Sequence, residues 1–554
     1  METGTGAART ATAAAPAVAN GQEQTELPAP PPTPEVEIAS VGKHALLMVS
    51  STIFIALLNY ALNIILGWTL PIEEYGRVGV SQTLIFICVW FVSAGFPLVV
   101  TGAIARAQSM RDEASAAEAA QQAWRTFKSA WLAGSVLSLA VVALLVGAFY
   151  TGVLPLEPVY APLIAMVAVT VGSLGIGSVP SAALQGLFRF GQLAGVKVFE
   201  ATVNIVVSVA LVLLGLGAAG ALGGFALSAA LAGVVSVWLL RDRRFWRVRG
   251  WGDLSALRQA VPMTFAVFGG VLLTNIDVLA IKFLTPSLQS DALSGAYQVA
   301  AVLARAPLFV GTALVSTFYP RLAQDARDTH DVGHTPRPSA RELLRWIMLG
   351  VLPINVIIAV AAPAVVLFFF PGHYASSASL LVVLAAGSGF LVVASALAAI
   401  LQAERRAGVP ALVMTVAVSF EIASLFLLVP AFGPMAAAAS AALMSALACT
   451  LLLWYCRRMD IAPRGLWRHA LSLAWLGALV APLAVFGGEW GRVPVALWVT
   501  GAGLLYAGMV LALNLVSAGE VAWQIPRSMG GALGTAARRA VGVAAWLNRI
   551  GPRL

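Results

Sequence analysis

Two charged side chains stand inside otherwise apolar segments of this 554-residue sequence, and their charges are opposite. Arg305 carries a planar guanidinium, whose paired N–H donors suit the oxygens of a phosphate or a carboxylate. Asp277 carries a carboxylate in the preceding apolar segment. At 1.5 Å per helical residue, the two lie about 12 Å and about 10 Å from the same end of a helical hairpin. Two interpretations stay open, an anion-binding site built on Arg305 or an ion pair that neutralises both groups.

Two further cations extend this set of candidates, because charges at membrane depth are unfavourable and therefore often functional. Lys282 lies near the end of the segment that contains Asp277. Its long stem can carry the ammonium to the interface, so snorkelling is the preferred interpretation and anion binding the alternative. Arg106 ends another apolar segment. We expect it either to contact an anionic ligand or to anchor the segment at the membrane surface.

Polar residues without a positive charge also lie in apolar segments. Glu200 and Glu421 are candidates for ion coupling together with Asp277, because a buried carboxyl can exchange a proton. A hydrogen-bonded structural carboxyl is the alternative for both. Asn59 and Asn275 either line a binding cavity or form hydrogen bonds between helices, a common role of Asn in membranes.

Several other kinds of site are not indicated. Three cysteines and five scattered histidines give neither a disulfide framework nor a metal-ligand spacing. No Gly-rich loop is followed by Lys and Ser or Thr, so ATP hydrolysis is not expected. The sequence therefore predicts no cofactor, no metal and no enzymatic activity.

The elements that must position these residues are membrane helices. The chain is 59% hydrophobic and 11% charged, which a soluble globule with a polar shell cannot accommodate. Segments of about 20 apolar residues match the bilayer core, where a helix satisfies its own backbone. The predicted fold is an all-α polytopic membrane protein with fourteen spans. The spans are 45–69, 79–104, 129–151, 158–184, 193–215, 218–240, 260–284, 296–319, 344–370, 377–402, 409–430, 434–456, 468–487 and 493–516.

The distribution of Lys and Arg predicts the orientation. All but four of them lie in, or at the edges of, alternate gaps between the apolar segments, the exceptions being Arg77, Lys282, Arg305 and Arg492. Cytoplasmic connections retain such cations, so both termini are predicted to be cytoplasmic. This placement explains the net charge of +9 without nucleic acid as a partner.

An internal repeat relates spans one to six to spans seven to twelve. Asn59 precedes Asn275 by 216 residues, and Gly217, Trp238 and Arg241 precede Gly433, Trp454 and Arg457 by the same interval. Six spans return each copy to the same side, which predicts parallel repeats with substrate between them. The predicted organisation is a disordered tail (1–43), an N-lobe (44–240), a cytoplasmic linker (241–259), a C-lobe (260–457), two extra spans (458–517) and a cytoplasmic amphipathic tail (518–554). A complete repeat pair predicts a monomer.

Several short motifs in order resemble the polysaccharide-flippase branch of the multidrug/oligosaccharidyl-lipid/polysaccharide exporter superfamily, and more distantly the lipid II flippases. The motifs are Leu70-Pro71-Ile72-Glu73-Glu74-Tyr75-Gly76, Gly95-Phe96-Pro97, Ile104-Ala105-Arg106, Leu184-Gln185-Gly186-Leu187-Phe188-Arg189, Asn275-Ile276-Asp277, Gly295-Ala296-Tyr297 and Pro320-Arg321-Leu322. The resemblance covers residues 45 to 458. It implies a two-lobed, V-shaped transporter in the bacterial cytoplasmic membrane.

The resemblance implies alternating-access transport of an undecaprenyl-diphosphate-linked oligosaccharide, for assembly of cell-surface polysaccharide or peptidoglycan. Its partners would be this lipid-linked oligosaccharide, membrane lipids and other polysaccharide assembly proteins. A cation-coupled multidrug or small-molecule antiporter is the first alternative, although such cavities are acidic and Arg305 is a cation. A membrane glycosyltransferase, a polymerase or an assembly scaffold is the second. The predicted external gaps are short, and Glu73-Glu74 is their only acidic pair, which disfavours an external active site.

Overall fold

The structure is a computed structural model. It describes residues 34–93, 95–108, 113–243, 248–252, 257–332, 338–404, 406–459, 466–513 and 515–516. The described residues are helical apart from short turns, and no strand occurs among them. This confirms the predicted all-α class. The predicted tail 518–554 and residues 1–33 lie outside the described residues.

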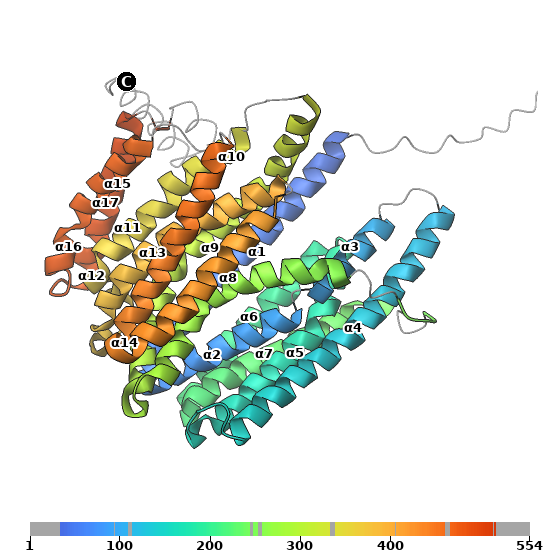
Figure 1. Ribbon diagram of the computed structural model, residues 1–554, viewed down its shortest axis with the longest axis horizontal. Helices are drawn as coiled ribbons and strands as arrows, with labels where there is room; N and C mark the ends of the chain where they lie inside the picture. The colour runs from blue at the N-terminus through green and yellow to red at the C-terminus, as the bar shows by residue number, and fades with distance from the viewer. Residues whose placement is uncertain are drawn as a thin grey trace, which may run out of the picture. The chain divides into compact units, whose positions relative to one another are not determined.

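The N-lobe is defined here by its helices, α1 to α7, which are shown from blue to green in Figure 1. Their bounds are α1 Pro34–Thr69, α2 Ile72–Ser93, α3 Gly95–Gln108, α4 Glu113–Tyr150, η1 Pro158–Tyr160, α5 Ala161–Gly186, α6 Phe190–Leu211, η2 Val212–Leu216, α7 Gly217–Leu239 and η3 Arg241–Arg243. Within this lobe, α7 packs along both α5 and α6, and α4 packs along α3 and α5.

The C-lobe comprises α8 to α14, and three further helices follow it. Their bounds are α8 Leu257–Leu284, α9 Ser287–Val332, α10 Pro338–Trp346, η5 Ile347–Val351, α11 Leu352–Val360, α12 Ala362–Phe369, η6 Gly372–Tyr374, α13 Ser377–Ala403, α14 Gly408–Arg458, α15 Leu466–Val480, α16 Pro482–Phe486 and α17 Arg492–Ala512. Here α13 packs on α9 and α14, and α14 packs on α8. The added helices α15, α16 and α17 contact α11 and α12, at one edge of Figure 1.

The surface and length of the helices suit a membrane. Large apolar side chains such as Leu144, Leu214 and Leu427 are 72%, 77% and 77% exposed. Among the described residues, eleven helical stretches are long and apolar enough to cross a bilayer. Two of these stretches contain a break, at Gly215 and Gly217 or at Gly433, where the backbone leaves the helical conformation. The predicted number of fourteen spans stays a prediction.

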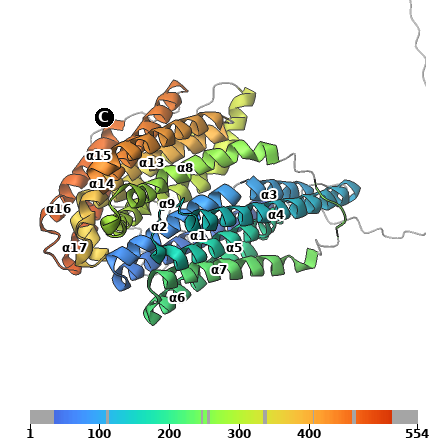
Figure 2. The ribbon, with the colours of Figure 1, turned by 60° about the horizontal axis from the view of Figure 1, so that its bottom comes forward.

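The two lobes contact each other mainly through α2 and α9, with α2 also packed on α8 (Figure 2). These two helices occupy corresponding places in the repeat, because Gly79 and Gln82 precede Gly295 and Gln298 by 216 residues. The backbones approach closely: a Cβ on Gly295 would lie 2.1 Å from the carbonyl oxygen of Ile72. Only glycine permits this approach.

Several element boundaries differ from the expected spans. The helix α1 begins at Pro34, so the last residues of the predicted disordered tail are helical, with proline in the first turn where it is tolerated. The predicted second span corresponds to α2 followed by α3, and residue 94 between them lies outside the described residues. The helix α4 begins well before its apolar segment, and α9 continues well past its own.

Candidate functional site

Arg305 and Asp277 meet between the adjacent helices α8 and α9, as their depths predict. A guanidinium nitrogen of Arg305 lies 3.8 Å from Oδ1 of Asp277. The same guanidinium donates to the carbonyl oxygen of Thr274 and, over 3.4 Å, to Oδ1 of Asn275. The Arg305 side chain remains 23% exposed, whereas Asp277 is 2% exposed. One face of the guanidinium is therefore held by the protein while part of it stays accessible.

Two buried groups complete this C-lobe cluster. The hydroxyl of Tyr297, on α9, donates to Oδ2 of Asp277, whose Oδ1 also accepts from the backbone N–H of Val278. Glu421 on α14 is fully buried, and neither of its carboxylate oxygens has a hydrogen-bond partner in the described part of the chain. It interacts electrostatically with both Asp277 and Arg305. The cluster thus contains two acids, one cation and a small cavity of about 40 Å³ beside Asp277 and Arg305.

A second polar region lies in the N-lobe, between α1, α2, α5, α6 and α7. Lys197 and Glu200, one turn apart on α6, form an ion pair of 2.9 Å. Both line two adjoining hollows of about 400 Å³ and 370 Å³. Asn59 also lines this region, so the repeat-related Asn59 and Asn275 belong to the polar regions of different lobes. Glu200 and Glu421 are likewise in different lobes.

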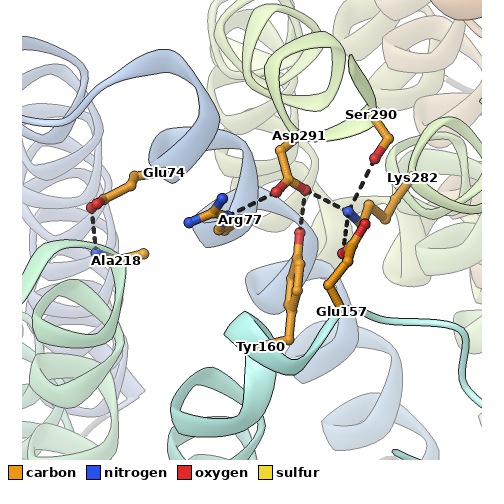
Figure 3. Close-up of polar contacts among 8 residues, drawn as sticks. All are labelled: Glu74, Arg77, Glu157, Tyr160, Ala218, Lys282, Ser290 and Asp291. Carbon is orange, nitrogen blue, oxygen red and sulfur yellow. Dashed lines mark hydrogen bonds and ion pairs between the residues drawn. The ribbon is translucent and has the colours of Figure 1, made fainter. Parts of the chain in front are cut away.

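A third polar cluster joins the lobes at the end that the sequence predicts to be external (Figure 3). The ammonium of Lys282 donates to Glu157 over 2.8 Å, to Asp291 over 2.6 Å and to the hydroxyl of Ser290 over 3.0 Å. We call Lys282, Asp291, Glu157, Arg77 and Tyr160 the interlobe network. Three of its residues come from the N-lobe and two from the C-lobe.

Asp291 is the acceptor at the centre of the interlobe network. Its Oδ2 accepts from Nε of Arg77 over 2.8 Å, and its Oδ1 accepts from the hydroxyl of Tyr160 over 2.6 Å. Nearby, Glu74 accepts from the backbone N–H of Ala218 over 2.9 Å, which caps the beginning of α7 (Figure 3). The predicted external acidic pair therefore has a structural contact through Glu74.

The expectation that Lys282 snorkels to the surface is wrong. Its side chain is 1% exposed, because Glu157 and Asp291 supply opposite charges within the protein. Two other predicted residues are not brought to the Arg305 cluster. Arg106 lies exposed in the last turn of α3, and Asn59 lines the N-lobe hollows.

Aromatic residues close the same end of the interface. The indole N–H of Trp68, on α1, donates to the carbonyl oxygen of Phe369 over 2.8 Å, and the guanidinium of Arg492 lies 4.7 Å from the centre of the Trp68 ring. Tyr75 packs edge-on against Tyr374, the centres of their rings being 5.9 Å apart. Burial raises the pKa of Tyr374 above its usual value, so this ring stays uncharged at neutral pH. These contacts add to the interlobe network.

Sequence reasoning missed the roles of Arg77, Glu157, Asp291 and Lys197. A signal existed for Arg77 and Arg492, since both break the distribution of Lys and Arg in the gaps, and both form contacts between helices at this end. Lys197 lies near the beginning of the predicted span 193–215, and it lines the N-lobe hollows. Within the described ranges, no group of three or more His, Cys, Asp or Glu is arranged to hold a metal ion.

Comparisons with solved structures show the fold. The inward closed conformation of the lipid II flippase MurJ superposes with a TM-score of 0.62 at 11% identity, covering 84% of this chain and 98% of MurJ. An inward-facing multidrug resistance MATE family transporter of the MOP superfamily has a TM-score of 0.55 at 14% identity. The match covers 75% of this chain and 98% of the transporter. A mutant of the Vibrio cholerae MATE transporter VcmN has a TM-score of 0.53 at 14% identity. The match covers 77% of this chain and 98% of VcmN.

Sequence comparison identifies the family. No curated protein matches the sequence. The family model described as polysaccharide biosynthesis protein matches residues 41–325, which is more than half of the chain and includes Asp277, Lys282 and Arg305. With the fold of a polytopic membrane transporter and this match, the chain belongs to the polysaccharide biosynthesis protein family.

Proposed function

We propose that this protein translocates an undecaprenyl-diphosphate-linked oligosaccharide across the bacterial cytoplasmic membrane, with both termini in the cytoplasm. The observation that carries the proposal is Arg305, a partly exposed cation held at membrane depth by Thr274 and Asn275. The family match and the fold shared with a lipid II flippase agree with it. The lipid tail would stay in the bilayer while the head group passes between the lobes.

Arg305 is suited to a diphosphate because its existing ion pair is long. At 3.8 Å from Asp277, the guanidinium is only loosely engaged by that carboxylate. Phosphate oxygens can form shorter, charge-assisted and paired hydrogen bonds with the same donors. The incoming diphosphate would therefore compete with Asp277 for Arg305, and the displaced carboxylate would keep the hydroxyl of Tyr297.

Asp277 and Glu421 form the proposed coupling site. Two buried acids that interact with each other require a compensating positive charge or a proton. Arg305 supplies one cation to the pair, and Glu421 has no hydrogen-bond donor among the described residues. A proton or a small cation at Glu421 would compensate the second carboxylate. When the diphosphate takes Arg305 from Asp277, head-group binding would be coupled to the occupancy of this acid pair by a proton or a cation.

The interlobe network is the proposed external gate. It joins α2 and η1 of the N-lobe to α8 and α9 of the C-lobe through ion pairs, among which the Lys282 side chain is buried and those of Arg77, Asp291 and Glu157 are partly exposed. Release of the head group outside requires these contacts to separate. Alternating access by rocking of two repeats would break this network while new contacts form at the cytoplasmic end.

A cation-coupled antiporter is the second candidate, and the buried acids Asp277 and Glu421 favour it. Such acids suit a cationic substrate as well as a coupling ion. Arg305 distinguishes the candidates, because a substrate cation would be repelled by it whereas a diphosphate would bind it.

The test is a transport assay in proteoliposomes that contain the full-length protein. Fluorescent undecaprenyl-diphosphate-linked saccharide is placed in one leaflet, and its arrival in the other is followed by its sensitivity to an impermeant quencher. We expect transport by the wild type, a loss of at least tenfold in Arg305→Ala and partial retention in Arg305→Lys. Arg345→Ala, which removes a cation that binds the carbonyl of Leu515, is the control. Unchanged transport in Arg305→Ala would exclude this head-group site, and export of cationic dyes with no lipid transport would favour the antiporter.

A further inference from the structure

The two hollows of the N-lobe have a chemistry different from that of the Arg305 cluster. They share the lining residues Lys197, Glu200, Leu174 and Val89, so they adjoin each other. Their volumes of about 400 Å³ and 370 Å³ each lie within the range of roughly 300–1,000 Å³ typical of small-molecule sites. The region is therefore large enough for a ligand, and Arg305 is not part of its lining.

The charges of this region balance. Its ammonium and carboxylate, those of Lys197 and Glu200, are joined over 2.9 Å and are 46% and 20% exposed. A phosphate would have to break this pair to obtain the ammonium, and an organic cation would have to break it to obtain the carboxylate. The pair thus favours an uncharged polar ligand over either ion.

Three hydroxyl groups in the lining retain acceptor lone pairs. Thr170 donates to the carbonyl oxygen of Met166, Ser181 to that of Gly177 and Ser228 to that of Phe225. A hydroxyl has one donor and two acceptor lone pairs. Each donor is used within its helix, so lone pairs remain as acceptors. Thr170 and Ser228 are 1% and 2% exposed, whereas Ser181 is partly exposed, with its Oγ 3.2 Å from that of Ser236.

A buried donor faces the same region. Gln82 is 5% exposed and lines the hollow, and its Nε2 has no hydrogen-bond partner among the residues that the structure describes. An unpaired buried amide is unfavourable, because it has lost its hydrogen bonds to water. A ligand oxygen would remove this penalty, so Gln82 indicates that the ligand carries acceptors as well as donors.

Exposed aromatic rings form the apolar part of the lining. Phe86 and Trp90 follow Gln82 at one-turn intervals on α2, and their side chains are 44% and 40% exposed. Flat apolar rings beside groups that donate and accept hydrogen bonds match a ligand with C–H faces and a rim of hydroxyls. A saccharide ring has this combination.

We infer that the N-lobe hollows form a saccharide subsite, which binds the sugar nearest the diphosphate while Arg305 of the C-lobe binds the diphosphate itself. This inference rests on the proposed function and assigns the two parts of one substrate to different lobes. Gln82 would donate to a sugar oxygen, and Trp90 would cover an apolar face of the ring. The N-lobe would then recognise the sugar, and the C-lobe would bind the diphosphate of the lipid.

The experiment compares two probes on the purified full-length protein. One is undecaprenyl diphosphate, and the other is the lipid-linked saccharide fraction extracted from a host strain that lacks this protein. Binding is measured for the wild type, Gln82→Leu, Trp90→Ala and Arg305→Ala. Gln121→Leu, at an exposed position of α4, is the matched control for the glutamine. Trp90→Ala provides a second test because the exposed side chain can be removed with little effect on packing.

We expect Gln82→Leu and Trp90→Ala each to weaken binding of the saccharide-bearing lipid at least fivefold and to leave undecaprenyl diphosphate within twofold. Arg305→Ala should weaken both probes, and Gln121→Leu neither. If Arg305→Ala weakens both probes while the two N-lobe variants change neither, or change both equally, the saccharide subsite is wrong and the proposed function stands. If Arg305→Ala changes neither probe, the proposed function fails together with the inference.

Discussion

Arg77 of α2 donates from Nε to Oδ2 of Asp291 of α9 over 2.8 Å, and so joins the two lobes by a partly buried ion pair. Each lobe contributes one cation and one anion to the surrounding network. The N-lobe supplies Arg77 and Glu157, and the C-lobe supplies Lys282 and Asp291. Because each half is neutral, the lobes can separate without leaving a net charge on either face.

This relationship predicts that weakening the Arg77–Asp291 pair opens the external side. We expect Arg77→Ala to increase alkylation of a cysteine at position 59 by an impermeant maleimide added outside cells, by about tenfold, which corresponds to about 1.4 kcal/mol. The three native cysteines are replaced beforehand. Arg77→Lys, which keeps a cation for Asp291, should leave alkylation closer to the starting rate than Arg77→Ala does. Equal labelling in all variants would show that this pair does not keep the external side closed.

Lys282 should make a large contribution to stability. Lys282→Met leaves Glu157 and Asp291 without their shared buried cation, and removal of one partner of a buried pair costs about 3–5 kcal/mol. We expect a smaller loss than this range, because the Glu157 side chain is 38% exposed and Asp291 keeps Arg77 and Tyr160. The thermal midpoint of the purified protein should fall clearly, and Lys197→Met, at a half-exposed ion pair, should lower it less. The reverse order would contradict the buried network.

Replacement of Glu421 should stabilise the protein and remove the coupling of transport to an ion gradient. Its carboxylate is buried without a described partner and beside Asp277, so Glu421→Gln removes an unfavourable charge. We expect the thermal midpoint to rise while lipid transport loses its dependence on an imposed ion or pH gradient. Glu200→Gln is the matched control, and should instead lower the midpoint slightly because it breaks the pair with Lys197. A destabilised Glu421→Gln that keeps gradient-dependent transport would exclude the proposed coupling role.

The repeat-related glycines Gly217 and Gly433 should respond differently to alanine. Both have positive φ, at 52° and 60°, with ψ of −139° and −146°. Strain alone should make Gly433→Ala destabilising by about 1–3 kcal/mol, since no atom lies within 4 Å of its added Cβ. Gly217→Ala adds a contact of 2.2 Å with Oε2 of Glu74, the cap of α7. Unfolding in denaturant should therefore rank Gly217→Ala as the more harmful, and equal effects would indicate that Glu74 moves away easily.

The sequence by itself determined the helices and one site contact. A helix in lipid must satisfy its own backbone, so the apolar segments define the helices without knowledge of their neighbours. Sequential helices form a hairpin, and residues at similar depths on them meet. The contact between Asp277 and Arg305 was predictable for this reason. The corresponding positions of Gly217 and Gly433 were predictable from the repeat.

Only the tertiary structure decided which distant charges meet. Lys282 looks like a snorkelling lysine in the sequence, because its partner Glu157 lies 125 residues earlier. The pairing of α2 with α9 depends on how the two lobes are rotated and tilted against each other. Apolar helices that are surrounded by lipid carry no strong periodic pattern of polarity to specify that rotation. This rotation is specified instead by the close approach of the backbones at Gly295 and by the ion pair of Arg77 and Asp291. These contacts exist only once the lobes are packed together.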